Sequence, residues 1–365
     1  MIQPYQIDRI FKRLTGLYQE MENDLIVQIA KYFKGDEPTD MYRWQLSRLE
    51  QMGGVRKDAI KIISEYSGKA PEEVTRAFRL VSVTALEDDE KRYQALARAG
   101  QNIPVPIGAS PALEQILSAT IHNAKNALNL TNTTALQASM RSYTDIVDRV
   151  YLETMTGVSS YQTAVRRGVI ELADKGIQTV TYAGGRKTHV DVALRRNILT
   201  SSAQMVGGMQ IQRAREWGNN LVEVSSHADA RPEHAEWQGM IYSLEGGTAD
   251  YPNLAAATGY GTGEGLMGWN CRHVFYPFFE GLSEQVHTSY NEEEVEKAYE
   301  DSQTQRAMER DIRKWTRREM AADALGDEDT AAGARAKIKE KHAEYQAFSK
   351  KAGRTPRTGR AIVHS

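Results

Sequence analysis

The sequence predicts a mainly α-helical protein with a small α+β, glycine-rich central unit and long amphipathic helices at both ends. Three observations carry this prediction. Apolar residues recur at steps of three and four along the first and last parts of the chain. Short runs of β-branched and aromatic residues gather after about residue 220. Within that region, eight of the thirty residues from Gly239 to Gly268 are glycine, which is typical of loops.

The first third of the chain has the periodicity of helices. Apolar residues from Ile7 to Phe33 form a single stripe, and Gly35 follows it as a stop signal. Pro71 is followed by two glutamates, a pattern that favours the first turn of a new helix. The expected helices cover residues 7–33, 41–52, 55–66 and 71 to about 99.

The remainder of the chain divides by composition. Three prolines between residues 101 and 111 indicate a linker, and no proline follows until Pro232. Short strands are expected at 177–182, 221–225, 240–244 and 274–278. The predicted parts are an N-terminal helical region 1–100, a linker 101–111, a helical middle 112–219, a loop-rich α+β unit 220–285, C-terminal helices 286–352 and a basic flexible tail 353–365.

Composition excludes several classes of protein. The 365 residues are 26% charged and 41% hydrophobic, as in ordinary globular chains, and the net charge is −2. No run of eighteen apolar residues occurs, so a membrane span is not expected, and the N-terminus lacks the apolar core of a secretory signal. Cys271 is the single cysteine, so an intrachain disulfide is excluded and a reducing compartment is expected.

The C-terminal stretch from residue 350 to 360 is basic and contains no acidic residue. Such a stretch can attract phosphate groups, which makes a DNA-binding accessory protein one alternative function. A solvated tail with no partner is the other interpretation. The candidate nucleic-acid contacts are Lys350, Lys351, Arg354, Arg357 and Arg360.

Three of the eight histidines and the only cysteine lie in two short segments of the glycine-rich region. Imidazole and thiolate are the ligands that zinc prefers, and a loop-rich unit gains stability from a metal that ties its segments together. The spacing matches no standard zinc pattern, so a cluster of packed, hydrogen-bonded side chains is the alternative. The candidate ligands of a structural zinc are His227, His234, Cys271 and His273, and the expected structural braces around them are Arg231, Arg272, Trp237 and Trp269.

The same cluster allows enzymatic alternatives. A metal-dependent hydrolase or nuclease would use these ligands with an open coordination position and a general base such as Glu233 or Glu236. A nuclease-like variant of this interpretation places the metal at Asp229, His234 and Glu236. A nucleophilic Cys271 beside a histidine has no oxyanion hole or nucleophile elbow to support it. The glycines of residues 259–265 lack the ending of a phosphate-binding loop. We therefore predict no catalytic residues and no enzyme.

Three segments together resemble a known family. They are His189–Arg196, Ser226–Gly239, which reads SHADARPEHAEWQG, and Asn270–His273, which reads NCRH. This pattern resembles the tailed-phage minor capsid proteins of the second type, related to head-morphogenesis proteins, and the match is specific from about residue 190 to 315. One departure is Leu194, which stands before the arginines of the first segment.

The resemblance implies a virion structural protein rather than an enzyme. It implies a place at the portal vertex inside the head, with the portal protein or the major capsid protein as partner and packaged DNA as a possible neighbour. A role in head assembly, DNA packaging or ejection, and assembly in the host cytoplasm, follow from the same resemblance.

Overall fold

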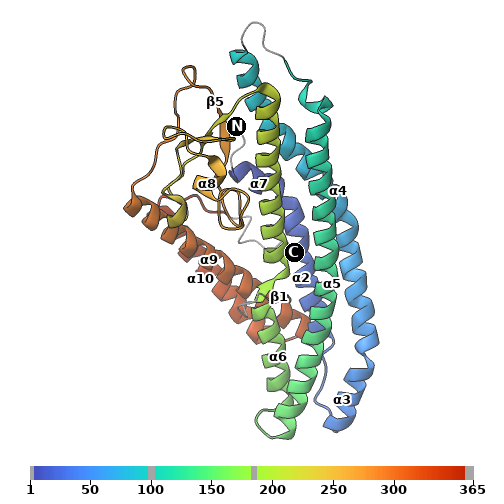
Figure 1. Cartoon of the computed structure of the whole chain (residues 1–365). Helices are drawn as coiled ribbons and strands as arrows, with labels where there is room; N and C mark the ends of the chain where they lie inside the picture. The colour runs from blue at the N-terminus through green and yellow to red at the C-terminus, as the bar shows by residue number, and fades with distance from the viewer. Residues whose placement is uncertain (1–3, 98–102, 182–186, 358–365) are drawn as a thin grey trace. The chain divides into compact units, whose positions relative to one another are not determined.

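The computed structural model describes residues 4–97, 103–181 and 187–357 (Figure 1). These residues are mainly helical, with one small mixed region, which confirms the predicted fold class. The α-helices are α1 (Pro4–Ile10), α2 (Lys12–Lys31), α3 (Met41–Glu50), α4 (Met52–Leu96), α5 (Pro111–Met155), α6 (Tyr161–Lys175), α7 (Val190–Trp217), α8 (Leu254–Thr258), α9 (Glu292–Leu325) and α10 (Glu328–Lys351). The strands are β1 (Gln178–Thr181), β2 (Lys187–His189), β3 (Leu221–Val224), β4 (Ile241–Ser243) and β5 (Phe275–Phe278), and 3-10 turns are η1 (Ile107–Ala109) and η2 (Pro232–His234).

The sequence predicts that one helix ends at about residue 66 and that another begins at Pro71. This prediction is wrong. Residues 52–96 form the single helix α4, with Pro71 inside it. A proline in a helix removes one hydrogen bond and costs about 3 kcal/mol. The apolar face around it, including Ala70, Val74 and Phe78, is fully buried, and this burial offsets the local cost. Tertiary packing thus overrides the local helix-breaking signal.

The described residues fold into two compact units, each assembled from three segments. Unit 1 takes residues from 1–13, 72–126 and 195–303, and unit 2 takes residues from 14–71, 127–194 and 304–365. The helices α4, α5, α7 and α9 each contribute to both units. The segments predicted from composition are continuous in sequence, whereas each unit joins stretches that are far apart along the chain.

Unit 2 is helical apart from the antiparallel pair β1–β2. Its aromatic core includes the buried Tyr143, whose ring lies 5.2 Å from that of Phe33 and whose hydroxyl donates to the Arg48 carbonyl at 2.9 Å. Trp44 of α3 meets Tyr161 of α6 edge to face at 5.6 Å. Phe33 is the last residue of the apolar stripe that the N-terminal sequence predicts, and the other aromatic residues come from outside that stripe.

Unit 1 contains the sheet with strand order β4–β3–β5, in which both pairs are antiparallel. The three strands predicted after residue 220 are therefore confirmed, and so is the strand predicted at 177–182, which is β1. The core of unit 1 lies between this sheet, α8 and part of α7. Its buried members are Ala203, Val222, Val224, Trp237, Tyr242, Leu254, Leu266, Met267, Val274, Phe275 and Tyr276.

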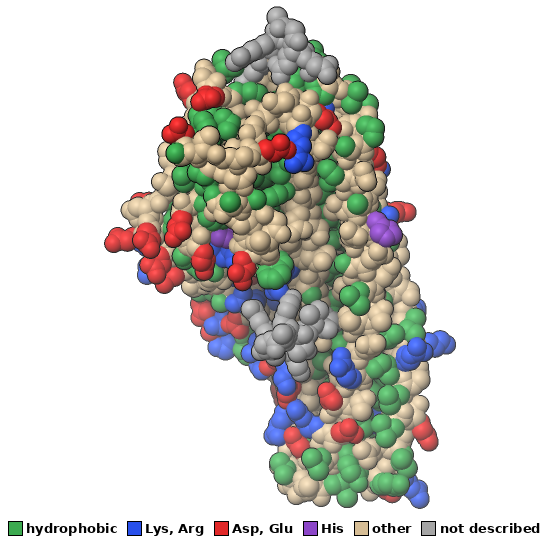
Figure 2. Space-filling view, in the orientation of Figure 1, with side chains coloured by type: hydrophobic (Ala, Val, Ile, Leu, Met, Phe, Trp, Pro, Cys, Tyr) green, Lys and Arg blue, Asp and Glu red, His purple; other side chains and the backbone are tan. Residues whose placement is uncertain are grey.

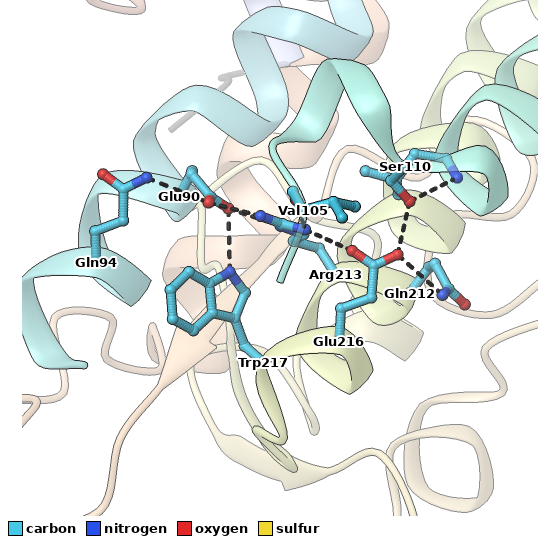
Figure 3. Close-up of polar contacts among 9 residues, drawn as sticks. Glu90, Gln94, Val105, Ser110, Gln212, Arg213, Glu216 and Trp217 are labelled. Carbon is cyan, nitrogen blue, oxygen red and sulfur yellow. Dashed lines mark hydrogen bonds and ion pairs between the residues drawn. The ribbon is translucent and has the colours of Figure 1, made fainter. Parts of the chain in front are cut away.

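Unit 1 also contains a buried cation, Arg213, whose guanidinium lies 5.8 Å from the centre of the Trp217 ring (Figure 3). The side chain of Arg213 on α7 is 1% exposed and pairs with Glu90 of α4 at 2.6 Å and with Glu216 at 2.5 Å. Trp217 donates from its indole nitrogen to Glu90 at 3.2 Å. Hydrogen bonds from Arg213 and Trp217 overcome the opposing effect of burial and hold the pKa of Glu90 below its ordinary value. The network therefore contains one cation and two carboxylates, all satisfied within unit 1.

Charge is unevenly distributed along α9. Its first turn carries Glu292, Glu293 and Glu294, and acidic side chains gather on the surface where this helix begins (Figure 2). Carboxylates at a helix N-terminus interact favourably with the helix dipole. None of the described helices has the length and apolar character needed to cross a membrane.

The glycine-rich loop after α8 is held by backbone contacts that leave no room for side chains. A Cβ atom on Gly265 would overlap the carbonyl oxygen of Gly259, and one on Gly268 would overlap that of Gly263. The amide of Leu266 donates to the Thr258 carbonyl at 3.0 Å and so closes the loop. These glycines are therefore required by close approach of the backbone, as composition suggested.

Gly265→Ala is expected to lower the free energy of unfolding by about 3 kcal/mol, because the added methyl group meets a main-chain oxygen that cannot rotate away. Urea denaturation followed by circular dichroism measures the change. Gly333→Ala on α10 is the matched control, since nothing lies within 4 Å of its Cβ position, and it should stabilise by about 0.5–1 kcal/mol. Equal stability of the two variants would show that the loop contacts are not maintained.

Candidate functional site

The histidine and cysteine residues come together because of the antiparallel pairing of β3 with β5. In this pairing Val224 is opposite Phe275, so the chain leaving β3 and the chain entering β5 share one end of the sheet. Ser225 secures that end: its amide donates to the Val274 carbonyl at 2.8 Å, and its hydroxyl accepts from the Val274 amide at 3.0 Å. His273 precedes β5 and is thereby placed beside the segment that follows β3.

Three of the four predicted ligands lie together. One donor atom from each of His234, Cys271 and His273 lies within 4.8 Å of the others. The Cys271 sulfur is 3.6 Å from Nδ1 of His273. The fourth predicted ligand, His227, stacks its ring on that of His273 with centroids 4.2 Å apart. The structure therefore assembles the predicted cluster from two segments, with His227 at its border.

Hydrogen bonds orient two of these rings. Nε2 of His234 is 2.9 Å from the Glu264 carbonyl oxygen, and Nε2 of His273 is 3.1 Å from Oε1 of Gln238. That amide oxygen also accepts from the backbone amide of His227 at 3.0 Å. Because both partners of the histidines are acceptors, each Nε2 carries the proton when the ring is neutral, and each Nδ1 keeps a lone pair.

Burial controls the protonation of the cluster. Removal from water holds the pKa of His273 well below its ordinary value, and the neighbouring His227 and His234 lower it further. Burial likewise lowers the pKa of His234. Burial raises the pKa of the Cys271 thiol, which is the opposite of what an activated nucleophile needs. The chemistry that this arrangement supports is metal coordination by neutral imidazoles rather than attack by a cysteine.

The four predicted braces occupy different positions. Arg231 donates to the carbonyl oxygens of Glu264 at 3.3 Å and Trp269 at 3.0 Å, which joins η2 to the glycine-rich loop. Arg272 donates to Asp229 at 2.8 Å. The ring of Trp237 is buried against those of His234 and His273, at centroid distances of 4.6 and 4.7 Å. Trp269 is 56% exposed, although a Cβ on Gly263 would touch its ring.

The residues required by the hydrolase alternative are dispersed. Asp229 is engaged by Arg272 at 2.8 Å and lies 3.2 Å from Nδ1 of His227. The side chains of Glu233 and Glu236 are exposed, and neither belongs to a group of potential metal ligands found among the described residues. The carboxylate beside the cluster, Asp229, is thus paired with Arg272, and neither of the glutamates expected as a general base joins the clustered ligands.

The candidate nucleic-acid contacts lie at the end of unit 2. Lys350 and Lys351 end α10. Arg354 donates to the side-chain oxygen of Gln305 at 3.1 Å, and the amide of Arg357 donates to the Tyr345 hydroxyl at 2.7 Å. Arg360 lies outside the described residues. Contact of these residues with DNA stays a prediction.

Sequence reasoning missed a second group of potential ligands, in unit 2. Glu22, His189 and Asp191 bring donor atoms within 4.8 Å of one another. Burial would raise the pKa of Glu22, but His189 and Arg317 hold it below its ordinary value, whereas burial and the nearby Glu22 raise the pKa of Asp191. The carboxylate of Glu22 also accepts from the backbone amide of Ile177 at 2.8 Å, so hydrogen bonds from within unit 2 already satisfy it. Only the separation of 167 residues between Glu22 and His189 hid this group from the sequence.

Comparison with known proteins places the chain in a class. It is similar to a protein named "Structural protein" of Lactococcus phage LL-H, with 26% identity over 339 residues, which span 87% of this chain and 90% of the relative. It is also similar to a "Structural protein" of Lactococcus phage mv4, with 42% identity over 69 residues, 19% of this chain and 56% of the relative. No match was found among solved structures. The similarity is therefore to structural proteins of phages.

The family assignment is more specific. Residues 2–350 match the family described as phage minor capsid protein 2, and the chain belongs to that family. The resemblance based on the segments after residue 189 is thereby confirmed. The match also includes the N-terminal third of the chain, where the sequence pattern predicts helices but carries no family resemblance. The His/Cys cluster thus lies in the part of the chain that carries the family resemblance.

Proposed function

We propose that the protein is a minor component of the phage head, located at the portal vertex. Its partners there are the portal protein or the major capsid protein, and its role is in head assembly, DNA packaging or ejection. The observation that carries the proposal is the family match over residues 2–350. The similarity of 339 residues to a phage structural protein supports the same assignment.

Exposed apolar side chains in unit 2 support a protein partner. Leu152 and Met155 in the last turn of α5 are 62% and 57% exposed, and Val158 just beyond the helix is 70% exposed. Large apolar residues gathered on a surface are typical of sites that another protein covers. In a phage head built from many subunits, a neighbouring subunit would cover such a surface.

The proposal predicts that purified phage particles contain this chain at a fixed ratio to the portal protein, below that of the major capsid protein. Quantitative mass spectrometry of particles purified on a density gradient measures the ratio. Tail-less heads from a tail-assembly mutant should keep the chain, and isolated tails should lack it. Recovery of the chain with tails would contradict the location. Its absence from both mature particles and DNA-free procapsids would contradict the structural role.

Placement at the portal vertex needs its own measurement. Cross-linking of tail-less heads followed by mass spectrometry should join this chain to the portal protein, with lysine or acidic residues of both chains in the linked peptides. Cross-links to the major capsid protein in the absence of any portal cross-link would contradict a position at the vertex. The predicted lack of catalytic activity agrees with membership in a minor capsid family, and it stays a prediction.

A further inference from the structure

We propose that His234, Cys271 and His273, completed by His227, bind one structural zinc ion that ties η2 and the segment after β3 to the loop before β5. This inference concerns the stability of unit 1 and is independent of the place of the protein in the phage particle. Three features of the cluster support this proposal: the orientation of two rings, the separation of the donor atoms, and the ring of His227, whose buried nitrogens make no hydrogen bond.

The first observation is the orientation of two imidazoles. Histidines that bind zinc commonly donate their second ring N–H to a carbonyl or carboxylate oxygen, which fixes the tautomer and aims the other nitrogen at the metal. His234 and His273 have this arrangement, with Nε2 directed at the Glu264 carbonyl and at Oε1 of Gln238. Nδ1 of each ring therefore keeps the lone pair that a metal requires.

The second observation is the separation of donor atoms. In tetrahedral zinc sites the Zn–S and Zn–N distances are about 2.3 and 2.0 Å, which places neighbouring sulfur and nitrogen ligands about 3.5 Å apart. The Cys271 sulfur and Nδ1 of His273 are 3.6 Å apart. The donor atom of His234 lies within 4.8 Å of both. One pair of donor atoms thus has the spacing that a zinc ion imposes, and the third lies close to both.

The third observation is His227. Both nitrogens of its ring are buried, and neither makes a hydrogen bond, although Nδ1 lies 3.2 Å from Asp229. Leaving a buried polar atom without a partner costs about 1–3 kcal/mol. Its ring is already stacked on that of His273, with centroids 4.2 Å apart, so it borders the three clustered ligands. Binding of this imidazole to the metal would satisfy it and complete four ligands.

The chemistry of the donors selects the metal and its role. One thiolate with imidazoles suits zinc better than magnesium or calcium, which prefer oxygen ligands. Four protein ligands leave no open position for a substrate, as in structural zinc sites. The side chains come from η2, the loop before β5 and the segment after β3, so a shared ion restrains three parts of the chain that have little regular structure.

The full-length chain, purified without a histidine tag from cells grown with added zinc, tests the proposal. Elemental analysis should find about one zinc per chain, and X-ray absorption at the zinc edge should show one sulfur at about 2.3 Å with nitrogen neighbours at about 2.0 Å. Replacement by Co²⁺ should produce a thiolate-to-cobalt charge-transfer band. Less than about a tenth of a zinc per chain, with the fold unchanged in chelator, would falsify the proposal.

Variants assign the ligands. Cys271→Ser and His234→Ala are expected to lose zinc and unfold at a lower temperature than the wild type. His227→Ala should keep the ion but release it to a chelator more readily. His122→Ala, at an exposed position on α5, is the matched control and should behave like the wild type. If the Co²⁺ form of Cys271→Ser kept the charge-transfer band, the sulfur ligand would be wrong. If His227→Ala resisted chelator like the wild type, the fourth ligand would be wrong.

Discussion

Arg213→Ala is expected to lower the free energy of unfolding by about 3–5 kcal/mol, because it leaves the buried carboxylate of Glu90 and the partly buried carboxylate of Glu216 without their cation. The side chain of Arg213 is 1% exposed, and those of Glu90 and Glu216 are 12% and 17% exposed, so water can compensate little of the lost pairing. The substitution also removes the hydrogen bond of 2.9 Å to the Val105 carbonyl (Figure 3).

Urea denaturation of the variant, followed by tryptophan fluorescence and circular dichroism, measures this loss. Arg215→Ala is the matched control, since it removes the same type of side chain from the same helix. Arg215 and its partner Glu245 are 56% and 66% exposed, and such pairs contribute about 0–1 kcal/mol. A loss below about 1 kcal/mol for Arg213→Ala would contradict the buried network.

A double variant separates the unpaired charge from the lost packing. Glu90→Gln combined with Arg213→Met removes one carboxylate and its cation together while keeping similar volumes. Replacing both members of a buried pair is commonly much less costly than removing one of them. We therefore expect the double variant to recover part of the stability lost in Arg213→Met alone, and a purely additive loss would contradict charge coupling.

Asp89→Asn is expected to have a higher free energy of unfolding than the wild type. The difference between the two proteins should be about 3 kcal/mol larger at pH 8 than at pH 5. Burial raises the pKa of Asp89 to about 7 from an ordinary value of 3.8, and the hydrogen bond from Gln210 at 2.7 Å only partly opposes this rise. Oδ1 of the same carboxyl is buried without a partner. The folded protein therefore holds a carboxylate in an unfavourable place at alkaline pH.

The direction of this pH effect on the free energy of unfolding follows from proton linkage. Because the folded pKa exceeds the unfolded value, the folded state binds the proton more tightly, and stability falls as the pH rises from about 4 to about 7. Above that range the penalty from this one group is constant at about 4 kcal/mol. An asparagine has no charge at either pH and keeps an oxygen that can accept from Gln210.

Urea denaturation of both proteins at pH 5 and pH 8 measures the difference. Glu87→Gln, at an exposed position two residues earlier on α4, is the control and should change the pH dependence by less than about 0.5 kcal/mol. A pH dependence of Asp89→Asn that equals that of the wild type would show that this carboxyl is ionised normally in the folded state.

Local signals in the sequence determined most of the secondary structure. The strand at 221–224, the helical character of residues 112–219 and the end of the first long helix before Gly35 follow from apolar periodicity and from stop residues. Pro71 is the exception, because its effect depends on whether the helix face around it is buried. The candidate ligands were identified by residue type, since thiol and imidazole groups are scarce and were concentrated in two segments.

Only the tertiary structure decided which of these groups meet. Pairing of β3 with β5 brings His273 to the segment that follows residue 224, and the partners of the rings, Gln238 and Glu264, then fix the nitrogen that faces the cysteine. Arg213 pairs with Glu90, which lies 123 positions away in the sequence, and no local sequence pattern predicts this pair. The physical reason is that the spacing of apolar residues in the sequence predicts which side chains share one face of a helix or strand. Burial, charge pairing and ligand geometry arise between elements, after the chain has packed.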